Sequence, residues 1–491
     1  MFHPDLRKLV AAGLLILWPA SLAAQPAASS NQAPLSELVD RHYLDLLELA
    51  PSLTFSGSEY DRYRKELKQE KDREKDRLKD EEKVIEKRLD ELRKQLKKLN
   101  DERSTDTPEM SEQRTRIHCE VLNLEKRLQD KRIERTEGLN VTFDNRLAKV
   151  DLMEEWPAKE REIERTIKEE KARQRRHGDV ADIGFRKVGE GQEKDIKLGQ
   201  DAIQELKLYR LMPPEIEDEA VNHYVQQVAA KIAANSDLTV PLKVTVLRSE
   251  EINAFALPGG FLFINSGLLN KAASESEVAG VIAHEVAHVT ARHGAQLMRR
   301  ATVAAMMLQL AQVAAALFTG GISNIGTYYA LQYGFYGLGM VLNLELLGVS
   351  RSFEMEADQL GTQYAWKAGY DPRGFVTFFD AMASEEGYVR SVSFFRTHPP
   401  FFDRIVSTMS EIEYLPRKNE LVVDTMQFRN FQADLRDVLS QKLPEEPGRP
   451  SLADEPDCEG YEFDSEETDN AGQGIVASGR TRMTEACGVC Y

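Results

Sequence analysis

The sequence has 491 residues, more than one domain usually contains, so two or three structural units are expected. Charged residues make up 30% of the chain and the mean hydropathy is -0.45, which indicates that part of the chain is very polar and extended. A formal net charge of -17 argues against a nucleic acid as partner, because phosphate contacts need lysines and arginines clustered on a basic face.

The N-terminus has the three parts of a secretory signal. Arg7 and Lys8 precede an apolar run at residues 9–18, and small residues follow it. We predict a signal peptide at residues 1–24 and export to the periplasm. An uncleaved anchor helix is the alternative, although the run is shorter than the roughly 20 residues that span a bilayer. Residues 25–57 are expected to form a linker and a short helix.

Residues 58–178 form a highly charged region with helical spacing. Apolar residues recur three, four and seven positions apart, on both sides of Pro108, at Leu78, Ile85, Leu89, Leu92, Leu96, Leu99, Ile117, Val121, Leu124 and Leu128. This spacing predicts an antiparallel coiled-coil hairpin. A third charged helix is expected at residues 154–176, with Trp156 and Pro157 at its start. The hairpin is either a partner-binding arm or a spacer whose charged faces are solvated.

A globular domain is predicted at residues 185–440, where ordinary hydrophobic content returns. Leu242–Leu247 and Gly260–Asn265 have the composition of strands, and a helical pattern resumes at Glu275.

Two segments of this domain are strongly apolar, namely Ala301–Phe318 and Tyr328–Leu347. Glutamines and glycines interrupt both of them. We predict buried core helices there, and contact of residues 301–347 with a membrane is the alternative.

The four cysteines are Cys119, Cys458, Cys487 and Cys490, and export permits disulfides between them. Cys487 and Cys490 form a Cys-x-x-Cys pair, for which a redox or metal role is one alternative. We instead expect a disulfide from Cys458 to Cys487 or Cys490. It would lie in the tail, residues 441–491, which is acidic, poor in apolar residues and predicted to be disordered.

The segment His284-Glu285-Val286-Ala287-His288 carries the residues of a zinc hydrolase. Positions i and i+4 of a helix share one face, so His284 and His288 can offer ring nitrogens to one metal ion. From its place beside the first histidine, Glu285 can reach a water on the metal. The neighbouring residues are apolar, as in a buried helix. Chance occurrence is the alternative that further residues must exclude.

A zinc hydrolase also needs a third protein ligand and keeps its fourth position for water. Glu354 and Asp358 lie one helical turn apart in a segment whose apolar neighbours predict a second buried helix. Glu354 is expected to complete the site of one Zn²⁺ per chain. Asp358 is expected to accept a hydrogen bond from a ligand histidine and fix its tautomer. An exposed acidic helix is the alternative.

Three blocks in this order resemble the zinc peptidase family that includes HtpX, the CAAX prenyl proteases and the exported proteases of outer-membrane assembly. They are Asn-Ala-Phe-Ala-Leu-Pro-Gly-Gly at 253–260, the metal helix extended by Arg292-His293-Gly294, and Ser-Arg-x-x-Glu-x-Glu-Ala-Asp at 350–358. The resemblance runs from Glu190 to Ser410. It implies an α+β fold of the gluzincin type, predominantly helical with a small β-sheet, and Glu354 as the third zinc ligand.

A fourth segment, Thr397-His398-Pro399-Pro400 followed by Arg404, is similar to the family's Ser/Thr-His-Pro-Pro segment and its downstream arginine. We expect His398 to occupy the open position of the zinc and keep the enzyme latent, with a turn residue near the site as the alternative. Arg404 is expected to orient the substrate or polarise its carbonyl.

The resemblance also implies that an extended substrate pairs with an edge strand of the sheet, near Phe261 to Asn265. The predicted substrate-binding residues are Asn253, Ala254, Phe255, Phe261 and Phe263.

Together these features predict a zinc metalloendopeptidase of the cell envelope. It would hydrolyse extended or misfolded proteins, including outer-membrane proteins, and bind a partner protein through the hairpin. One alternative is a periplasmic chaperone or assembly factor with little or no proteolysis. The other is an integral-membrane protease in which residues 301–347 span twice, which their glutamines and glycines argue against.

Overall fold

The computed structural model describes most of the chain between residues 33 and 441. The described residues are 33–101, 107–171, 175–208, 212–298, 350–384, 398, 402–441 and 458. The predicted signal peptide, the apolar residues 301–347 and nearly all of the tail lie outside them. None of the helices in these ranges is long and apolar enough to cross a membrane.

The N-terminal part is made of helices. Two short ones, α1 (Leu35–Leu38) and α2 (Tyr43–Leu49), lead through a 3-10 turn at Ala50–Ser52 into α3 (Gly57–Asp101). Helix α3 has 45 residues, which corresponds to a length of about 68 Å.

Helix α4 (Pro108–Ile133) starts at an N-cap, where the Thr107 side chain accepts a hydrogen bond from the Met110 amide. It continues through one π-helical turn, Glu134–Gly138, into α5 (Leu139–Lys168). The prediction of a separate helix starting at Trp156 and Pro157 is therefore wrong. Pro157 lies inside α5, because the apolar residues that precede it continue the same buried helix face.

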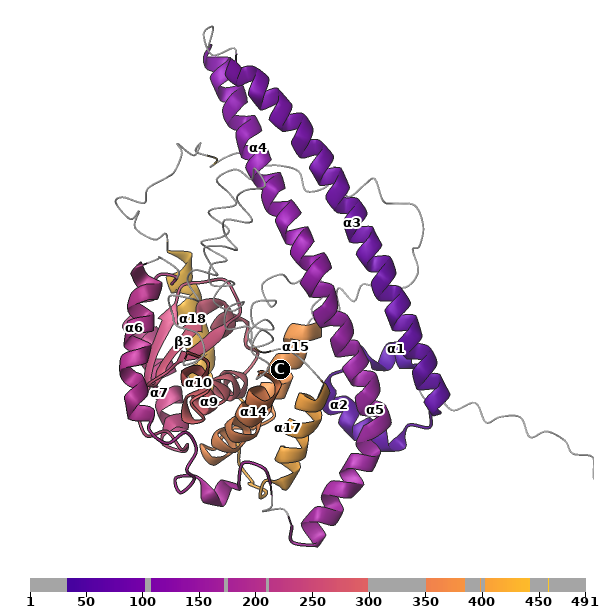
Figure 1. Cartoon of the computed structure of the whole chain (residues 1–491), viewed down its shortest axis with the longest axis vertical. Coiled ribbons are helices and arrows are strands. Elements are labelled where there is room, and N and C mark those ends of the chain that lie inside the picture. The colour runs from indigo at the N-terminus through magenta and orange to yellow at the C-terminus, as the bar shows by residue number, and fades with distance from the viewer. Residues whose placement is uncertain are drawn as a thin grey trace, which may run out of the picture. The chain divides into compact units, whose positions relative to one another are not determined.

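Helices α3 and α4 run side by side (Figure 1). Most of the predicted apolar residues form one hydrophobic cluster between them, made of Ile85, Leu89, Leu92, Ile117, Val121, Leu124 and Leu128, with the partly buried Leu96 and Leu99 packed against it. Ion pairs across the seam join Glu86 to Arg132 and Arg93 to Glu125, so later positions on α3 meet earlier positions on α4 and the helices are antiparallel. Their coiled-coil geometry stays a prediction. We call α3, α4 and α5 the helical arm.

A disulfide joins Cys119 on α4 to Cys458, which lies 339 residues further along the chain. The expected pairing of Cys458 with Cys487 or Cys490 is therefore wrong. The spacing of the cysteines favours a local bridge within the tail. Spacing along the chain contains no information on the distance between Cys458 and Cys119 in the folded protein.

The sheet has three strands, β1 (Lys243–Leu247), β2 (Ala254–Leu257) and β3 (Phe261–Asn265), in the order β1-β3-β2. Strand β3 pairs in parallel with β1 and antiparallel with β2. The tight turn between β2 and β3 contains Gly259 and Gly260, whose φ angles are 85° and 87°. Glycine adopts such positive φ angles without steric strain. The expectation of an edge strand at Phe261 to Asn265 is wrong, because β3 is hydrogen-bonded on both sides.

Helices surround this sheet. Short 3-10 turns at Val180–Asp182 and Gln192–Lys194 precede the helices, which are α6 (Asp195–Leu208), α7 (Glu219–Ala233), α8 (Ser266–Lys271), α9 (Glu275–Thr290), α10 (His293–Met298), α14 (Ser350–Lys367), α15 (Gly374–Ser384), α17 (Phe402–Tyr414) and α18 (Met426–Ser440). The predicted class, predominantly helical with a small sheet, is confirmed for the described residues.

Helices α14 and α15 approach α9 unusually closely, and glycines permit it. A Cβ atom at Gly361 on α14 would lie 2.9 Å from the Cα of His284 on α9. On α9 itself, a Cβ at Gly280 would lie 2.7 Å from the backbone nitrogen of Phe375 on α15. Real Cβ contacts are not this short, so both positions require glycine. These crossings bring side chains of α14 and α15 to the same face of α9.

A buried ion pair joins the helical arm to α15. Lys149 on α5 lies 2.8 Å from Asp380 on α15, and both side chains are 1% exposed. The second oxygen of Asp380 accepts a hydrogen bond from the Tyr43 backbone amide at 2.9 Å and lies 3.2 Å from His42 Nδ1. Two segments from the N-terminal part therefore converge on one carboxylate of α15.

Candidate active site

Helix α9 is the centre of the candidate site, and almost all of it is buried. Its residues from Glu275 to Thr290 are covered on all sides, and only His288 is partly exposed. A helix that is apolar on every face is stable only inside a protein, which explains the run of valines and alanines around the histidines. Polar groups in such a helix need partners, and those of the histidines include Glu354 and Asp358 on α14, His293 on α10 and His398.

The ligand atoms predicted from the sequence converge. The Nε2 atoms of His284 and His288 lie 3.0 Å apart, and each lies 3.4 Å from an oxygen of Glu354. His398 joins them, with Nδ1 3.0 Å from Glu354 and 3.2 Å from His284 Nε2. One ligand atom from each of the four residues lies within 4.8 Å of the others.

This donor set fits a divalent metal such as zinc, which prefers imidazole nitrogen and carboxylate oxygen. The Nε2 atoms of His284 and His288 face each other at 3.0 Å, so one cation could bind both. In addition, Glu354 Oε1 is buried and receives no hydrogen bond from the described residues. A buried carboxylate oxygen of this kind is costly unless it binds a cation.

The carboxylate of Asp358 supports His284 from behind. Its Oδ1 lies 3.0 Å from His284 Nδ1, on the side of the ring opposite to Glu354. Arg404 contacts the same carboxylate through Nε and Nη2, both at 2.7 Å. Burial by itself raises the pKa of Asp358, but Arg404 and His284 hold it below its ordinary value. Asp358 is therefore ionised, and its carboxylate faces His284 Nδ1.

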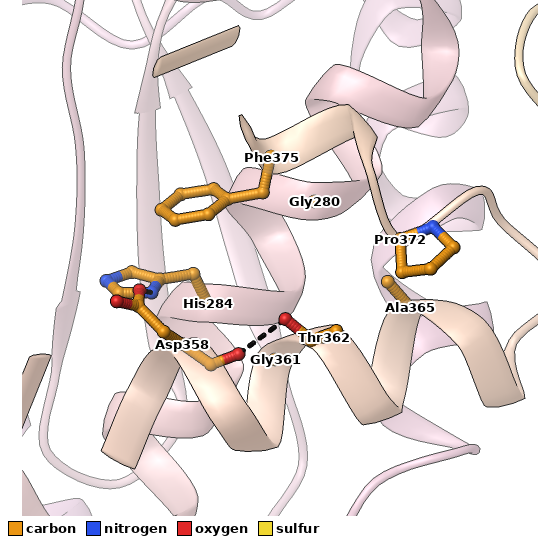
Figure 2. Close-up of a pocket in the computed structure, with 8 residues that line it drawn as sticks. All are labelled: Gly280, His284, Asp358, Gly361, Thr362, Ala365, Pro372 and Phe375. Carbon is orange, nitrogen blue, oxygen red and sulfur yellow. Dashed lines mark hydrogen bonds and ion pairs between the residues drawn. The ribbon is translucent and has the colours of Figure 1, made fainter. Parts of the chain in front are cut away.

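Packing fixes the ring of His284 as well. The Phe375 ring stacks on it with centroids 4.8 Å apart and planes 13° from parallel. Figure 2 shows the imidazole between Phe375 and Asp358, beside the glycine crossings at Gly280 and Gly361. A ring that is stacked and hydrogen-bonded in this way presents Nε2 in one direction only.

Arg404 is buried, and its guanidinium contacts two carboxylates and lies over the Phe379 ring, 5.4 Å from the ring centroid. Besides Asp358, its Nη1 lies 3.1 Å from Glu354 Oε2. Burial lowers the pKa of the guanidinium, yet these carboxylates raise it overall. The predicted contact of Arg404 with a substrate carbonyl stays a prediction.

His398 lies between the two glutamates of the site. Its Nε2 is 3.1 Å from Glu285 Oε1, while Nδ1 faces Glu354. Burial lowers the pKa of His398, but the two carboxylates raise it to about 10. Burial likewise raises the pKa of Glu354, whereas His398, Arg404 and His288 hold it well below its ordinary value. Glu354 is therefore ionised, and cationic side chains surround it.

The predicted substrate-binding residues lie in the sheet, but their side chains are buried. Phe255, Phe261 and Phe263 are 7%, 7% and 3% exposed and belong to a hydrophobic cluster with helix α6. Asn253 and Ala254 are buried too, at 4% and 0%. These side chains build the core, so a substrate that paired with the sheet would contact strand backbone instead, and β2 is the outer strand next to α9.

Two residues near the metal ligands were not assigned a role from the sequence. His293 Nδ1 lies 2.9 Å from His288 Nδ1, and His293 Nε2 lies 3.3 Å from Glu356 Oε2. The signal was present in the segment Arg292-His293-Gly294 and in the second glutamate of the 350–358 block. Without the fold, neither could be placed beside a particular ligand.

Comparison with known proteins agrees with this site. Residues 219–412 match the model of Peptidase family M48, and this range contains all the candidate ligands together with Glu285 and Arg404. The family resemblance predicted from the sequence is thereby confirmed.

Curated proteins resemble the same part of the chain. It is 33% identical over 219 residues to a Vibrio cholerae protein provisionally named a beta-barrel assembly-enhancing protease, covering 43% of each chain. It is 26% identical over 215 residues to the beta-barrel assembly-enhancing protease of Yersinia pestis, covering 42% of this chain and 41% of that one. With the mitochondrial metalloendopeptidase OMA1 of Schizosaccharomyces pombe it shares 33% identity over 184 residues, 37% of this chain and 50% of that one. The chain thus spans half or less of the length of these relatives.

Proposed function

We propose that this chain, whose residues 219–412 belong to peptidase family M48, is a zinc-dependent endopeptidase. The observation that carries the proposal is the convergence of His284 Nε2, His288 Nε2 and the Glu354 carboxylate beside Glu285. Zinc bound by these three residues would act as a Lewis acid on the scissile carbonyl and lower the pKa of water to about 7.

Within this proposal Glu285 is the general base. It takes a proton from the attacking water and passes it to the leaving amine. Asp358 keeps the Nδ1 proton on His284, so that Nε2 stays a lone-pair donor. Arg404 holds the carboxylates of Asp358 and Glu354 in place through its three nitrogen contacts.

The substrate class follows from the sheet. Strand β2 is an outer strand of the sheet and lies beside the zinc helix, so an extended polypeptide that paired with it would lie next to the metal site. Such pairing depends on conformation more than on sequence, which suits unfolded or misassembled proteins. With the predicted signal peptide and the bacterial relatives named for β-barrel assembly, we propose that the substrates are proteins of the cell envelope, met in the periplasm.

Removal of the metal tests the proposal directly. We expect the purified protein to cleave casein, to lose this activity with 1,10-phenanthroline and to regain it when Zn²⁺ is added back. The His398→Ala form is assayed beside the wild type, so that a latent site is not mistaken for an inactive one. Cleavage that persists without metal would contradict a metallopeptidase. Absence of cleavage by both zinc-loaded forms would favour the chaperone alternative.

His398 is proposed to keep the site latent. Its imidazole contacts both Glu285 and Glu354, so it competes with water for the metal and with the substrate for the general base. His398→Ala is therefore expected to raise the rate of casein cleavage, about tenfold or more, at equal zinc content. Unchanged or lower activity of His398→Ala would exclude the latency proposal. It would not affect the assignment of the three zinc ligands.

Glu354 is the ligand whose assignment depends on tertiary structure. Glu354→Ala removes a carboxylate that faces both ligand histidines, so the affinity for zinc is expected to fall about 100-fold, since even outer partners of ligands contribute 10–100-fold. Competition with a chromophoric chelator measures it. Glu277→Ala, which removes a buried glutamate on α9 that contacts Thr377, is the control. Equal affinity of the Glu354→Ala and wild-type proteins would remove Glu354 from the ligand set.

A further inference from the structure

We propose that His293 and Glu356 are positioning residues for the zinc ligand His288, and that His177 holds Glu356 in place. Each ligand histidine would then be oriented through its Nδ1 by a carboxylate, directly by Asp358 for His284 and through a second histidine for His288. The inference rests on the zinc site proposed above. It adds to that site a chain of contacts that reaches from the metal ligand to a loop before the sheet.

The geometry of the chain is continuous. From His288 Nδ1 to His293 Nδ1 the distance is 2.9 Å, and from His293 Nε2 to Glu356 Oε2 it is 3.3 Å. The other oxygen of Glu356 lies 3.3 Å from His177 Nδ1. His293 is 1% exposed, and its ring stacks on Phe353 with centroids 4.1 Å apart and planes 12° from parallel. Its two nitrogens are therefore aimed at fixed partners.

Metal binding determines where each proton of this chain lies. If His288 binds zinc through Nε2, its neutral ring carries its proton on Nδ1 and donates it to His293 Nδ1. His293 then accepts at Nδ1, so its own proton lies on Nε2 and is donated to the Glu356 carboxylate. His177 Nδ1–H donates to the second oxygen of the same carboxylate. Each contact of the chain then pairs one donor with one acceptor.

Glu356 is suited to accept these bonds. Its two oxygens face one histidine nitrogen each, because Oε2 lies 3.3 Å from His293 Nε2 and Oε1 lies 3.3 Å from His177 Nδ1. It also lines a cavity of about 740 Å³ together with His177 and Arg292. The outer end of the chain is thus open to water, whereas His293 at its inner end is closed off.

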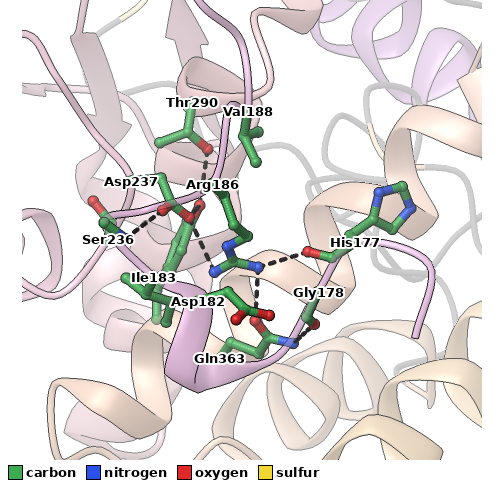
Figure 3. A network of polar contacts seen from close by, with 12 residues as sticks. His177, Gly178, Asp182, Ile183, Arg186, Val188, Ser236, Asp237, Thr290 and Gln363 are labelled. Carbon is green, nitrogen blue, oxygen red and sulfur yellow. Dashed lines mark hydrogen bonds and ion pairs between the residues drawn. The ribbon is translucent and has the colours of Figure 1, made fainter. Parts of the chain in front are cut away.

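His177 belongs to a loop at residues 175–191, which we call the strap. Its backbone carbonyl accepts a hydrogen bond from Arg186 Nη1 at 2.8 Å, and the same nitrogen donates to Gln363 on α14 at 2.9 Å. Gln363 in turn donates to the carbonyl of Gly178 at 2.9 Å, and Arg186 Nη2 lies 3.0 Å from Asp237. Figure 3 shows how these contacts hold the strap on α14 and leave His177 beside it.

Zinc affinity is the measurement that tests the proposal, because it does not depend on turnover. We expect His293→Ala and Glu356→Ala each to weaken zinc binding by about 10–100-fold. His293→Asn places an amide oxygen where Nδ1 was, so it should recover part of the affinity. His293→Gln places its amide near the Nε2 position and should behave like the alanine variant. A role in packing alone would not separate asparagine from glutamine in this order.

Cobalt substitution supplies a second readout. The d–d absorption bands of bound Co²⁺ depend on ligand geometry, so they should shift in His293→Ala and return toward the wild-type spectrum in His293→Asn. His223→Asn, which removes an exposed histidine on α7 that pairs with Gln227, is the matched control and should leave both affinity and spectrum unchanged. Circular dichroism confirms that each variant is folded, and if His293→Ala is not, the asparagine and glutamine pair decides.

The outcomes separate this proposal from the proposed function. Wild-type protein that binds no zinc would overturn both. Tight zinc binding by the wild type, with equal affinity and an identical cobalt spectrum in His293→Ala and Glu356→Ala, would overturn the positioning role alone. Equal affinity of His293→Asn and His293→Gln would also overturn it, because the hydrogen bond to His288 distinguishes them.

Discussion

Glu285→Gln is expected to lower kcat/KM for casein by about 10²–10⁴-fold, the usual contribution of a positioned general base. Gln has the same shape as Glu, but its amide cannot take a proton from water. Glu285 is 2% exposed, and its Oε1 faces His398 rather than bulk solvent. The loss should appear in kcat, because substrate pairing on β2 does not involve this carboxylate. The assay is run with His398→Ala as background, where cleavage is highest.

Two controls make the result specific. Zinc content must stay at one ion per chain, since Glu285 is not one of the three proposed ligands. Glu277→Gln makes the same chemical change on the same helix, at a buried glutamate that accepts hydrogen bonds from Ala273 and Thr377. It should leave cleavage within about twofold of its background. Full activity in Glu285→Gln would require another residue as the base.

Local spacing predicted the parts of the site that lie on one helix. The two histidines and Glu285 are fixed relative to each other by the helical repeat, so the sequence alone was sufficient to place them. Glu354 and Asp358 were also predicted, because their apolar neighbours indicated a second buried helix. The structure brings both carboxylates to the histidines, and it brings His398 there as well.

Features that depend on the packing of distant segments were not accessible from the sequence. Neither a strand pattern nor the family resemblance reveals the strand order of this chain, so the edge-strand expectation for Phe261 to Asn265 does not match β3, which is the central strand. In the same way, the disulfide of Cys119 with Cys458 joins parts 339 residues apart, and no spacing rule indicates such a pair. The helical arm differs from these features because its apolar residues follow a regular repeat along the chain. The sequence alone therefore identifies residues of the hydrophobic cluster between α3 and α4.

Asp380→Ala is expected to lower the free energy of unfolding by about 3–5 kcal/mol, the usual cost of leaving a buried charge without its partner. The Lys149 ammonium would lose a carboxylate at 2.8 Å, and the Tyr43 amide would lose its acceptor at 2.9 Å, in a place where neither can reach water. Urea unfolding followed by circular dichroism measures the change. Glu162→Ala breaks an exposed pair with Lys159 on the same helix as Lys149 and should cost less than about 1 kcal/mol.

A double variant separates the cost of an unpaired buried charge from the cost of losing the other contacts of Asp380. In the double variant Lys149→Met and Asp380→Leu no charge remains buried, so its loss of stability should be smaller than that of Asp380→Ala alone. Some loss should persist, because the Tyr43 amide still lacks an acceptor. If Asp380→Ala costs no more than Glu162→Ala, the ion pair does not hold the helical arm on α15. Since α15 also carries Phe375, which stacks on His284, a large loss would further mean that the arm stabilises the helix that supports the metal site.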